Sequence, residues 1–184
     1  MLITSGELRG KSLSFPATLR IRPTSDKVRS AVFDIIRFEI KGSRFLDLFA
    51  GTGAVGIQAL SEGSLISCFV EENSKCVNIV KENLKKTSFT GKAIIFKRKV
   101  EKFVIEQKEL IKDFDFIFLD PPYEYSDSEY SFILENLKSN LKAYATIIVE
   151  HSKKRLGEDF FKSLGFENYK LKRYGDTALA ILYN

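Results

Sequence analysis

Two short stretches of the chain carry residues whose types and spacing could support chemistry. The first is the loop Gly51-Thr52-Gly53-Ala54-Val55-Gly56, which has the pattern G-x-G-x-x-G. Glycines at these spacings let the backbone turn sharply and let a ligand lie directly against it. When such a loop joins a strand to a helix, it predicts a site for a nucleotide such as NAD, FAD or S-adenosylmethionine (SAM).

Two carboxylates near this loop help to choose among the nucleotides. Asp47 stands four residues before Gly51, and an anion so close to the loop would repel a pyrophosphate. The sulfonium and amino group of SAM carry positive charge and would be attracted instead. Glu71 lies eighteen residues after Gly53, where an acidic side chain can accept hydrogen bonds from ribose hydroxyls in NAD and SAM alike. We therefore favour SAM and keep an NAD-dependent oxidoreductase as an alternative.

The second stretch is Asp120-Pro121-Pro122-Tyr123, which follows the apolar run FDFIFL. Two consecutive prolines fix the backbone and remove two N–H donors, so their carbonyl groups can only accept hydrogen bonds. Asp120 adds a further acceptor, and Tyr123 offers a flat face on which a base can stack. Such a site suits a planar base with an exocyclic NH2, held so that its nitrogen attacks the SAM methyl group in line. The stretch therefore predicts direct methylation of a base amine.

The order of apolar and amphipathic runs predicts the elements that must position both stretches. A helix begins after an N-cap at Thr24 or Ser25 and runs to about Ile40. Strands are then expected at 44–49, 65–70, 92–96, 114–119 and 145–150, with helices at 53–62, 74–86, 100–109, 127–141 and 157–164. Two further strand-like runs flank Gly175-Asp176 and can only pair antiparallel. This alternation predicts an α/β fold whose mostly parallel sheet carries helices on both faces and gathers the two stretches at its carboxyl edge.

Length and composition set further limits. A chain of 184 residues that is 44% hydrophobic can form one domain with a substantial core. We expect a cytoplasmic protein without a membrane span, because no apolar run approaches about 18 residues and no secretory signal stands at the start. Cys68, Cys76 and the single histidine, His151, lack the spacing of a zinc site or a nucleophilic triad. We therefore expect no metal, two buried thiols and a structural or surface role for His151.

The net charge of +5 lies entirely in the first quarter of the chain. Residues 1–44 hold nine Lys and Arg against four Asp and Glu, whereas residues 45–184 hold twenty of each sign. A basic segment beside a neutral domain predicts a polyanionic partner. Residues 1–24 are expected to form a small basic appendage, with a hairpin around Gly6 to Phe15, on a SAM-binding catalytic core of residues 25–184.

The same residues resemble a known family. The strings FLDLFAGTGAVGI and DPPY, together with Glu71, look like the class I SAM-dependent methyltransferases that act on exocyclic amino groups. The strings SGELRGKSL at 5–13 and RPTSDKVRSAVFDII at 22–36 closely resemble the RsmD family, which methylates the N2 amine of a guanine in bacterial small-subunit (16S) ribosomal RNA. The resemblance covers nearly the whole chain. It implies a Rossmann-like sheet of seven strands in the order 3-2-1-4-5-7-6, with the last strand antiparallel.

The resemblance also implies roles for individual residues. The SAM site would include Asp47, Phe49, Ala50, Gly51, Thr52, Gly53, Glu71, Glu72, Val100 and Asp120. Catalysis would fall to Asp120, Pro121, Pro122 and Tyr123, and RNA would be held by Arg9, Lys11, Arg22, Thr24 and Arg29. One position departs from the family pattern, because Lys99-Val100 stands where relatives often have a small polar residue that contacts the adenine amine. Glu101 is the candidate for that contact here.

The expected partner is 16S rRNA or an assembly intermediate of the small ribosomal subunit, bound by a monomer. A DNA adenine-N6 methyltransferase, or one acting on another RNA amine, would use the same acceptors. Only the resemblance of the N-terminal strings separates these substrates. A non-catalytic RNA-binding protein is a third alternative beside the oxidoreductase, and the intact DPPY stretch counts against it.

Overall fold

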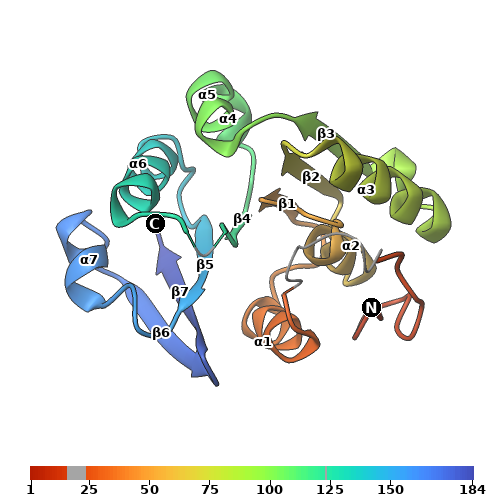
Figure 1. Ribbon diagram of the computed structural model, residues 1–184, viewed down its shortest axis with the longest axis horizontal. Coiled ribbons are helices and arrows are strands. Elements are labelled where there is room, and N and C mark those ends of the chain that lie inside the picture. Colours follow the sequence, from red (N-terminus) through yellow and green to blue (C-terminus); the bar gives the residue numbers. More distant parts are fainter. Residues whose placement is uncertain (16–23, 123) are drawn as a thin grey trace.

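The apolar runs of the chain join into one sheet of seven strands. The computed structural model describes residues 1–15, 24–122 and 124–184, and Figure 1 shows the sheet between two groups of helices. Its order is β3-β2-β1-β4-β5-β7-β6, which confirms the predicted topology. The five strands β1 to β5 pair in parallel, and β7 pairs antiparallel with both β5 and β6. Their bounds are β1 Arg44–Leu48, β2 Ile66–Glu71, β3 Ala93–Lys97, β4 Phe116–Leu119, β5 Thr146–Ser152, β6 Tyr169–Tyr174 and β7 Thr177–Tyr183.

Helices cover both faces of this sheet. Helices α1, α2 and α3 lie on one face, and α4, α5, α6 and α7 lie on the other (Figure 1). A central strand covered on both sides must be apolar at nearly every position, and all four residues of β4 are buried. The helix bounds are α1 Asp26–Ile36, α2 Ala54–Ser61, α3 Ser74–Thr87, α4 Val100–Glu106, α5 Lys108–Ile111, α6 Asp127–Lys138 and α7 Glu158–Ser163, with a 3-10 turn at Thr90–Lys92.

Among the described residues, the hydrophobic core has one cluster on the face covered by α4 to α7 and two clusters on the face covered by α1 to α3. Under α4, α6 and α7, the side chains of Phe103, Ile133 and Phe161 are fully buried against the sheet. On the other face, Val32 of α1 belongs to the same buried cluster as Phe118 of β4. None of the helices in the described part of the chain is both long and apolar enough to cross a membrane.

Most element bounds agree with the sequence prediction to within two residues, and three elements differ by more than that. α1 ends at Ile36 instead of Ile40, because the Glu39 N–H already bonds to the Ile36 carbonyl in a tighter turn and the chain then leaves the helix axis. The helix expected at 100–109 is two helices, α4 and α5, since Gln107 between them has non-helical backbone angles (φ −112°, ψ 34°). α6 ends at Lys138, three residues before the expected position. None of these differences moves a predicted site residue out of its element.

The N-terminal segment forms a hairpin, although its paired residues lie earlier than expected. Residues 1–3 bond to residues 11–13 around a turn at 5–10. Ile3 and Leu13 are only 1% and 4% exposed, in a buried cluster with α2 and α3. Two side chains of this small basic segment are therefore part of the hydrophobic core, while most of its turn is exposed.

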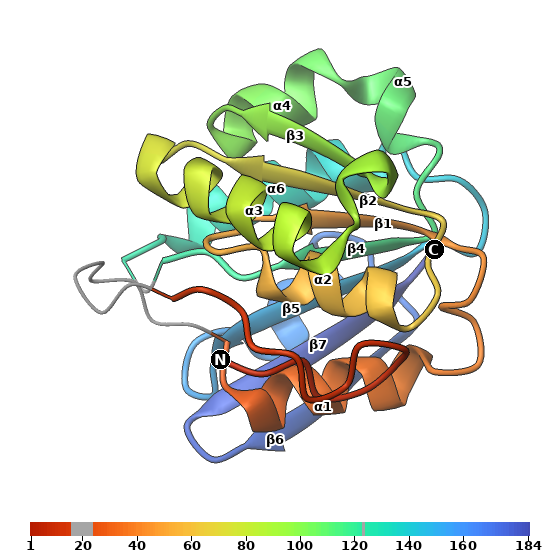
Figure 2. The ribbon, with the colours of Figure 1, turned by 90° about the vertical axis from the view of Figure 1, so that its right-hand side faces the viewer.

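The hairpin is docked by close contacts with α2. Gly6 (φ 80°) approaches the backbone of Ser61 so tightly that a Cβ atom at this position would have no room. The Leu8 N–H donates to the Ser61 hydroxyl at 3.0 Å, and the Thr4 N–H donates to the Gln58 side chain at 2.9 Å. Figure 2 shows the result, with the hairpin running alongside α1 and α2.

Candidate active site

A cleft of about 550 Å³ opens at the carboxyl edge of the parallel strands. Its walls come from the ends of β1, β2 and β4, the start of α4 and the N-terminal segment. The strand order reverses between β1 and β4, and open parallel sheets bind ligands at such a reversal. Both stretches that the sequence singled out meet in this cleft.

The glycine loop turns through left-handed residues. Phe49, Gly51 and Gly53 have φ angles of 63°, 54° and 78°. Glycine adopts such angles freely, whereas Phe49 must be held there by its surroundings. Gly53 is the N-cap of α2, and a Cβ atom on Gly56 would come within 3.0 Å of the Phe69 ring. The glycines thus allow both the turn and the close packing of α2 on β2.

Asp47 lies beneath this loop. Its side chain is only 2% exposed, and its Oδ2 atom accepts a hydrogen bond from the Gly56 N–H at 2.8 Å. Burial raises the pKa of Asp47 to about 8, and the nearby charges of Asp120 and Glu71 act in the same direction. A cation bound beside Asp47 would favour its ionised form. The site is therefore suited to a positively charged group.

Glu71 at the end of β2 holds the outer side of the loop. Its two carboxylate oxygens accept hydrogen bonds from the Gly51 N–H at 2.8 Å and the Asn73 N–H at 2.7 Å. Burial raises the pKa of Glu71 in spite of these two donors. Each oxygen keeps a lone pair for a further donor, as binding of ribose hydroxyls requires.

The second stretch enters the cleft directly from β4. β4 ends at Leu119, and Asp120, Pro121 and Pro122 line the cleft behind it. Pro121 is buried and Pro122 is exposed, while Tyr123 lies outside the described residues. The rigid acceptors predicted from the sequence thus stand across the cleft from the glycine loop.

Tyr125 forms part of the cleft wall just beyond this stretch. Its hydroxyl donates a hydrogen bond to the Glu101 carboxylate, and its ring meets Phe49 edge-on with centroids 5.1 Å apart. Burial and the Glu101 carboxylate raise the pKa of Tyr125, so it stays a donor. Glu101, the candidate for the adenine contact, lines the cleft and is already bonded to Tyr125.

The lining of the cleft is strongly acidic. Among the described residues it has two basic side chains, Arg98 and Lys99, against eight carboxylates: Asp47, Glu71, Glu72, Glu101, Asp120, Glu124, Glu129 and Glu150. Both basic side chains are paired with glutamates, Lys99 with Glu72 at 4.0 Å and Arg98 with Glu106. Such a cleft repels the pyrophosphate of NAD and attracts the cationic groups of SAM. The residues present fit SAM and disfavour the oxidoreductase alternative.

Most of the residues predicted for the cofactor lie together. Nine of the ten line the cleft, namely Asp47, Phe49, Ala50, Gly51, Thr52, Glu71, Glu72, Val100 and Asp120. The tenth, Gly53, faces Phe69 and Val80 inside the fold. Glycine is needed at this position for the turn into α2, and not for contact with a ligand.

The residues predicted for RNA are dispersed. Thr24 lines the cleft, whereas Arg9 is exposed on the turn of the hairpin and Lys11 is half-buried beyond it. Arg22 lies outside the described residues. The basic side chains of the hairpin therefore stand outside the acidic cleft, where they are free to face a different part of a nucleic acid.

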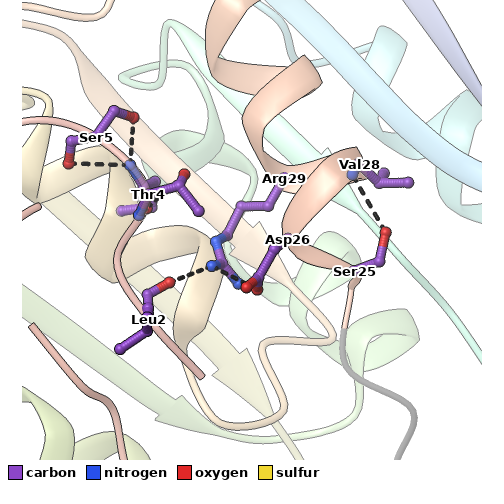
Figure 3. Close-up of polar contacts among 8 residues, drawn as sticks. Leu2, Thr4, Ser5, Ser25, Asp26, Val28 and Arg29 are labelled. Carbon is purple, nitrogen blue, oxygen red and sulfur yellow. Dashed lines mark hydrogen bonds and ion pairs between the residues drawn. The ribbon is translucent and has the colours of Figure 1, made fainter. Parts of the chain in front are cut away.

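Arg29 requires a correction. Its side chain is 0% exposed, and its guanidinium bonds to the Leu2 carbonyl oxygen and the Asp26 carboxylate (Figure 3). A side chain without exposed surface cannot reach an RNA phosphate in this conformation. We therefore remove Arg29 from the RNA-contacting set, because it joins α1 to the N-terminal segment instead. The prediction for Arg29 was wrong because the number of charged residues in a segment does not show which of them are buried.

Several cleft residues escaped the sequence analysis. Glu150 is 9% exposed near the carboxyl end of β5 and lines the cleft beside Asp120. Its place at a strand end was the signal that could have found it, because such ends meet at one edge. Met1 and Phe15 also line the cleft. No local pattern pointed to them, since the hairpin brings them there through long-range packing.

The two cysteines and the histidine are buried. Burial raises the pKa of the Cys68 thiol to about 12 and that of Cys76 to about 11, so neither is a ready nucleophile. His151 is 5% exposed, and burial lowers its pKa. Cys68 and His151 are packed against neighbouring elements, whereas Cys76, although 1% exposed, lines the cleft.

The strand order, the glycine loop at its reversal and the acidic cleft with its Asp-Pro-Pro acceptors define a class I SAM-dependent methyltransferase. Comparison with known proteins is more specific. The family model described as "Conserved hypothetical protein 95" matches residues 1–183. The chain belongs to this family, which is the RsmD family that its sequence resembles.

Individual relatives match over most of their length. The Bacillus subtilis protein YlbH is 37% identical over 161 residues, which cover 88% of this chain and 79% of that protein. The protein named ribosomal RNA small subunit methyltransferase D from Buchnera aphidicola is 33% identical over 153 residues, covering 83% and 78%. The solved structure of the Thermus thermophilus protein TTHA0928 has a TM-score of 0.82 at 30% identity and covers 99% of this chain and 98% of that one.

Proposed function

We propose that the chain transfers a methyl group from SAM to the exocyclic N2 amine of a guanine in 16S rRNA. The observation that carries the proposal is that Asp120, Pro121 and Pro122 line the same cleft as the glycine loop and Glu71. Relatives named ribosomal RNA small subunit methyltransferase D support rRNA as the substrate. We further propose that the protein acts as a monomer in the cytoplasm.

The cofactor half of the cleft holds its ligand through backbone and carboxylates. The glycine loop gives close access to the main chain, Asp47 offers negative charge once a bound cation favours its ionised form, and Glu71 offers acceptors for ribose hydroxyls. When bound, SAM supplies a methyl group on a sulfonium, and its transfer breaks the C–S bond, forms a C–N bond and leaves one proton on nitrogen to be released. The protein need not form a covalent bond to either reactant.

The base half acts on the target amine through fixed acceptors. The Asp120 carboxylate and the Pro121 carbonyl can accept both N–H groups, which orients the nitrogen lone pair toward the methyl group. Positive charge then develops on the nitrogen, and the carboxylate stabilises it without reorganisation. The same carboxylate is the neighbouring acceptor for the released proton. The proline rings keep these acceptors from moving.

The charge distribution suits an RNA whose target base enters the cleft while its phosphate backbone stays outside. An acidic cleft disfavours phosphates, so only the target base would enter it. Arg9 lies on the hairpin turn, which docks at the Ser61 end of α2, whereas the cleft lies at the Ala54 end. Eight helical residues span about 12 Å, so RNA in contact with both regions must extend at least that far.

A methyl-transfer assay with labelled SAM tests the proposal on three substrates: free 16S rRNA, small-subunit particles from a strain lacking the gene, and DNA. We expect label in the rRNA or the particles, with mass spectrometry of the digested RNA identifying N2-methylguanosine. Asp120→Asn protein is the negative control. Label on adenine, or on DNA alone, would select the alternative substrate class and overturn the proposal.

A further inference from the structure

We infer that Thr24 is a positioning residue for Asp120, an inference that rests on the proposed methyl transfer at that site. The Thr24 hydroxyl lies 3.0 Å from the Oδ2 atom of Asp120, which is 96 positions further along the chain. A hydroxyl facing a carboxylate at this distance donates its proton. Both residues line the cleft, and Thr24 is half-buried there. This hydrogen bond therefore joins the segments RPTSDKVR and DPPY, which lie far apart in the sequence.

The place of Thr24 is fixed by the residues that follow it. Ser25 is the N-cap of α1, and its carbonyl accepts the Arg29 N–H at 2.9 Å. The buried Arg29 guanidinium bonds to Asp26 at 2.9 Å and also to the Leu2 carbonyl (Figure 3). The first turn of α1 is thus tied to itself and to the N-terminal hairpin. Thr24, one residue before the cap, is left with little freedom.

Asp120 is held by the strand against which α1 packs. Val28 and Val32 of α1 are buried in the same cluster as Phe118 of β4, and Phe118 stands two residues before Asp120. The donor and the acceptor are therefore carried by two elements whose separation is set by close-packed side chains. A hydrogen bond prepared in this way needs no rearrangement when the substrate arrives.

A fixed donor on one oxygen serves the carboxylate in two ways. It holds the plane of the Asp120 side chain, so that the other oxygen keeps a constant direction for the target amine. It also favours the ionised form, which is the form that accepts hydrogen bonds at both oxygens. Around Asp120 stand other groups that carry or can carry charge, namely Asp47 of β1, Tyr130 of α6, Glu150 and His151 of β5, and Arg155 beyond β5.

The kinetic test compares Thr24→Val, which keeps the shape but loses the hydroxyl, with Thr24→Ser, which keeps the hydroxyl. Both are assayed on whichever nucleic acid the wild-type protein methylates. We expect the valine variant to lose about tenfold in kcat with KM for SAM within about twofold, because the change acts on the acceptor of the amine. The serine variant should stay within about twofold of wild type. Thr90→Val, at an exposed position in the 3-10 turn, is the matched control.

Carbon-13 NMR of protein labelled at the aspartate Cγ atoms tests the same point without substrate. The resonance missing from Asp120→Asn protein identifies Asp120. Its titration midpoint should rise by about 0.5–1 pH unit in Thr24→Val and stay unchanged in Thr24→Ser. Because no RNA is needed, this result is independent of the substrate proposed above.

Each of three results would overturn the inference. The first is a valine variant with the kcat of wild type, and the second is a serine variant as slow as the valine variant, which would point to the methyl group instead of the hydroxyl. The third is an Asp120 midpoint that does not move. If thermal melting shows that Thr24→Val is unfolded, Thr24→Ala takes its place in both measurements.

Discussion

The two halves of the cleft differ in the sequence separation of the hydrogen bonds that shape them. On the cofactor side, Asp47 bonds to Gly56 nine residues later, and Glu71 bonds to Gly51 twenty residues earlier. On the base side, Asp120 bonds to Thr24 across 96 residues. The hydrogen bonds that shape the glycine loop therefore lie within one strand–helix–strand unit, whereas the bond to Asp120 forms only when the N-terminal segment packs on the rest of the chain. Changes on the cofactor side should act through the fold of the glycine loop and the charge beneath it, and changes on the base side through single hydrogen-bonding side chains.

The largest expected effect lies on the base side. Asp120→Ala removes the acceptor that orients the amine, and we expect kcat to fall by about 10²–10³-fold or more. SAM affinity measured by calorimetry should fall by much less than kcat, because Asp120 borders the cofactor side but the glycine loop, Asp47 and Glu71 keep their contacts. Loss of SAM affinity comparable to the loss of kcat would mean that the two halves are not separate.

The second largest effect is expected from a substitution in the glycine loop on the cofactor side. Gly56→Ala would push a Cβ atom into the Phe69 ring, and we expect about 1–3 kcal/mol of lost stability in chemical denaturation. Gly91→Ala is the matched control, since a Cβ atom there meets nothing within 4 Å. Equal stability of the two variants would contradict the close packing described for α2.

The pH dependence of SAM binding should reveal Asp47. Its pKa of about 8 means that it holds a proton in the empty cleft at neutral pH, and binding of a cation favours release of that proton. Affinity for SAM should therefore rise with pH, by up to about tenfold per unit, and level off near pH 8. Asp47→Asn should flatten this dependence in calorimetric titrations between pH 6 and pH 8.

Asp47 should affect protein stability in the opposite direction, because the free energy of unfolding should fall with pH while SAM affinity rises. The folded protein keeps a proton that the unfolded chain releases above its usual pKa of 3.8, so this contribution to stability falls as pH rises from about 4 to about 8. The free energy of unfolding of wild type should thus decline relative to that of Asp47→Asn over this range. A constant difference between the two proteins would argue that Asp47 is ionised in the fold.

The smallest effect is expected on the hairpin outside the cleft. Replacing Arg9 and Lys11 by alanine should weaken RNA binding a few-fold and make the slope of log K against log salt shallower by about 1–2. Arg29→Ala, by contrast, should lower the melting temperature and leave the salt slope unchanged, because the guanidinium is buried. A changed slope in Arg29→Ala would restore that residue to the RNA-contacting set.

The sequence separation of the contacts also decides how much of the site could be predicted from the sequence. The glycine loop, Glu71 and Asp120 all follow apolar runs, so the rule that parallel strands share a carboxyl edge was enough to bring them together. The burial of Arg29 and its bond to Leu2 depend on how the hairpin docks, which no local pattern encodes. The bond between Thr24 and Asp120 has the same cause. The sequence could therefore place residues at strand ends near one another, although it missed Glu150, but it could not show which distant segments pack together.

The position of β7 in the sheet has a consequence for the order of assembly. β7 follows β6 in the chain but lies between β5 and β6, so β6 has no neighbour in the sheet until β7 is present. The two strands are joined at Tyr174 and Thr177, which pair directly, and hairpins this short close within about 1–10 μs. The pair should therefore form first and then add to β5 as one unit. We therefore expect the sheet to be completed in one docking step, whose rate should respond to mutations at Gly175 and Asp176, neither of which lines the cleft.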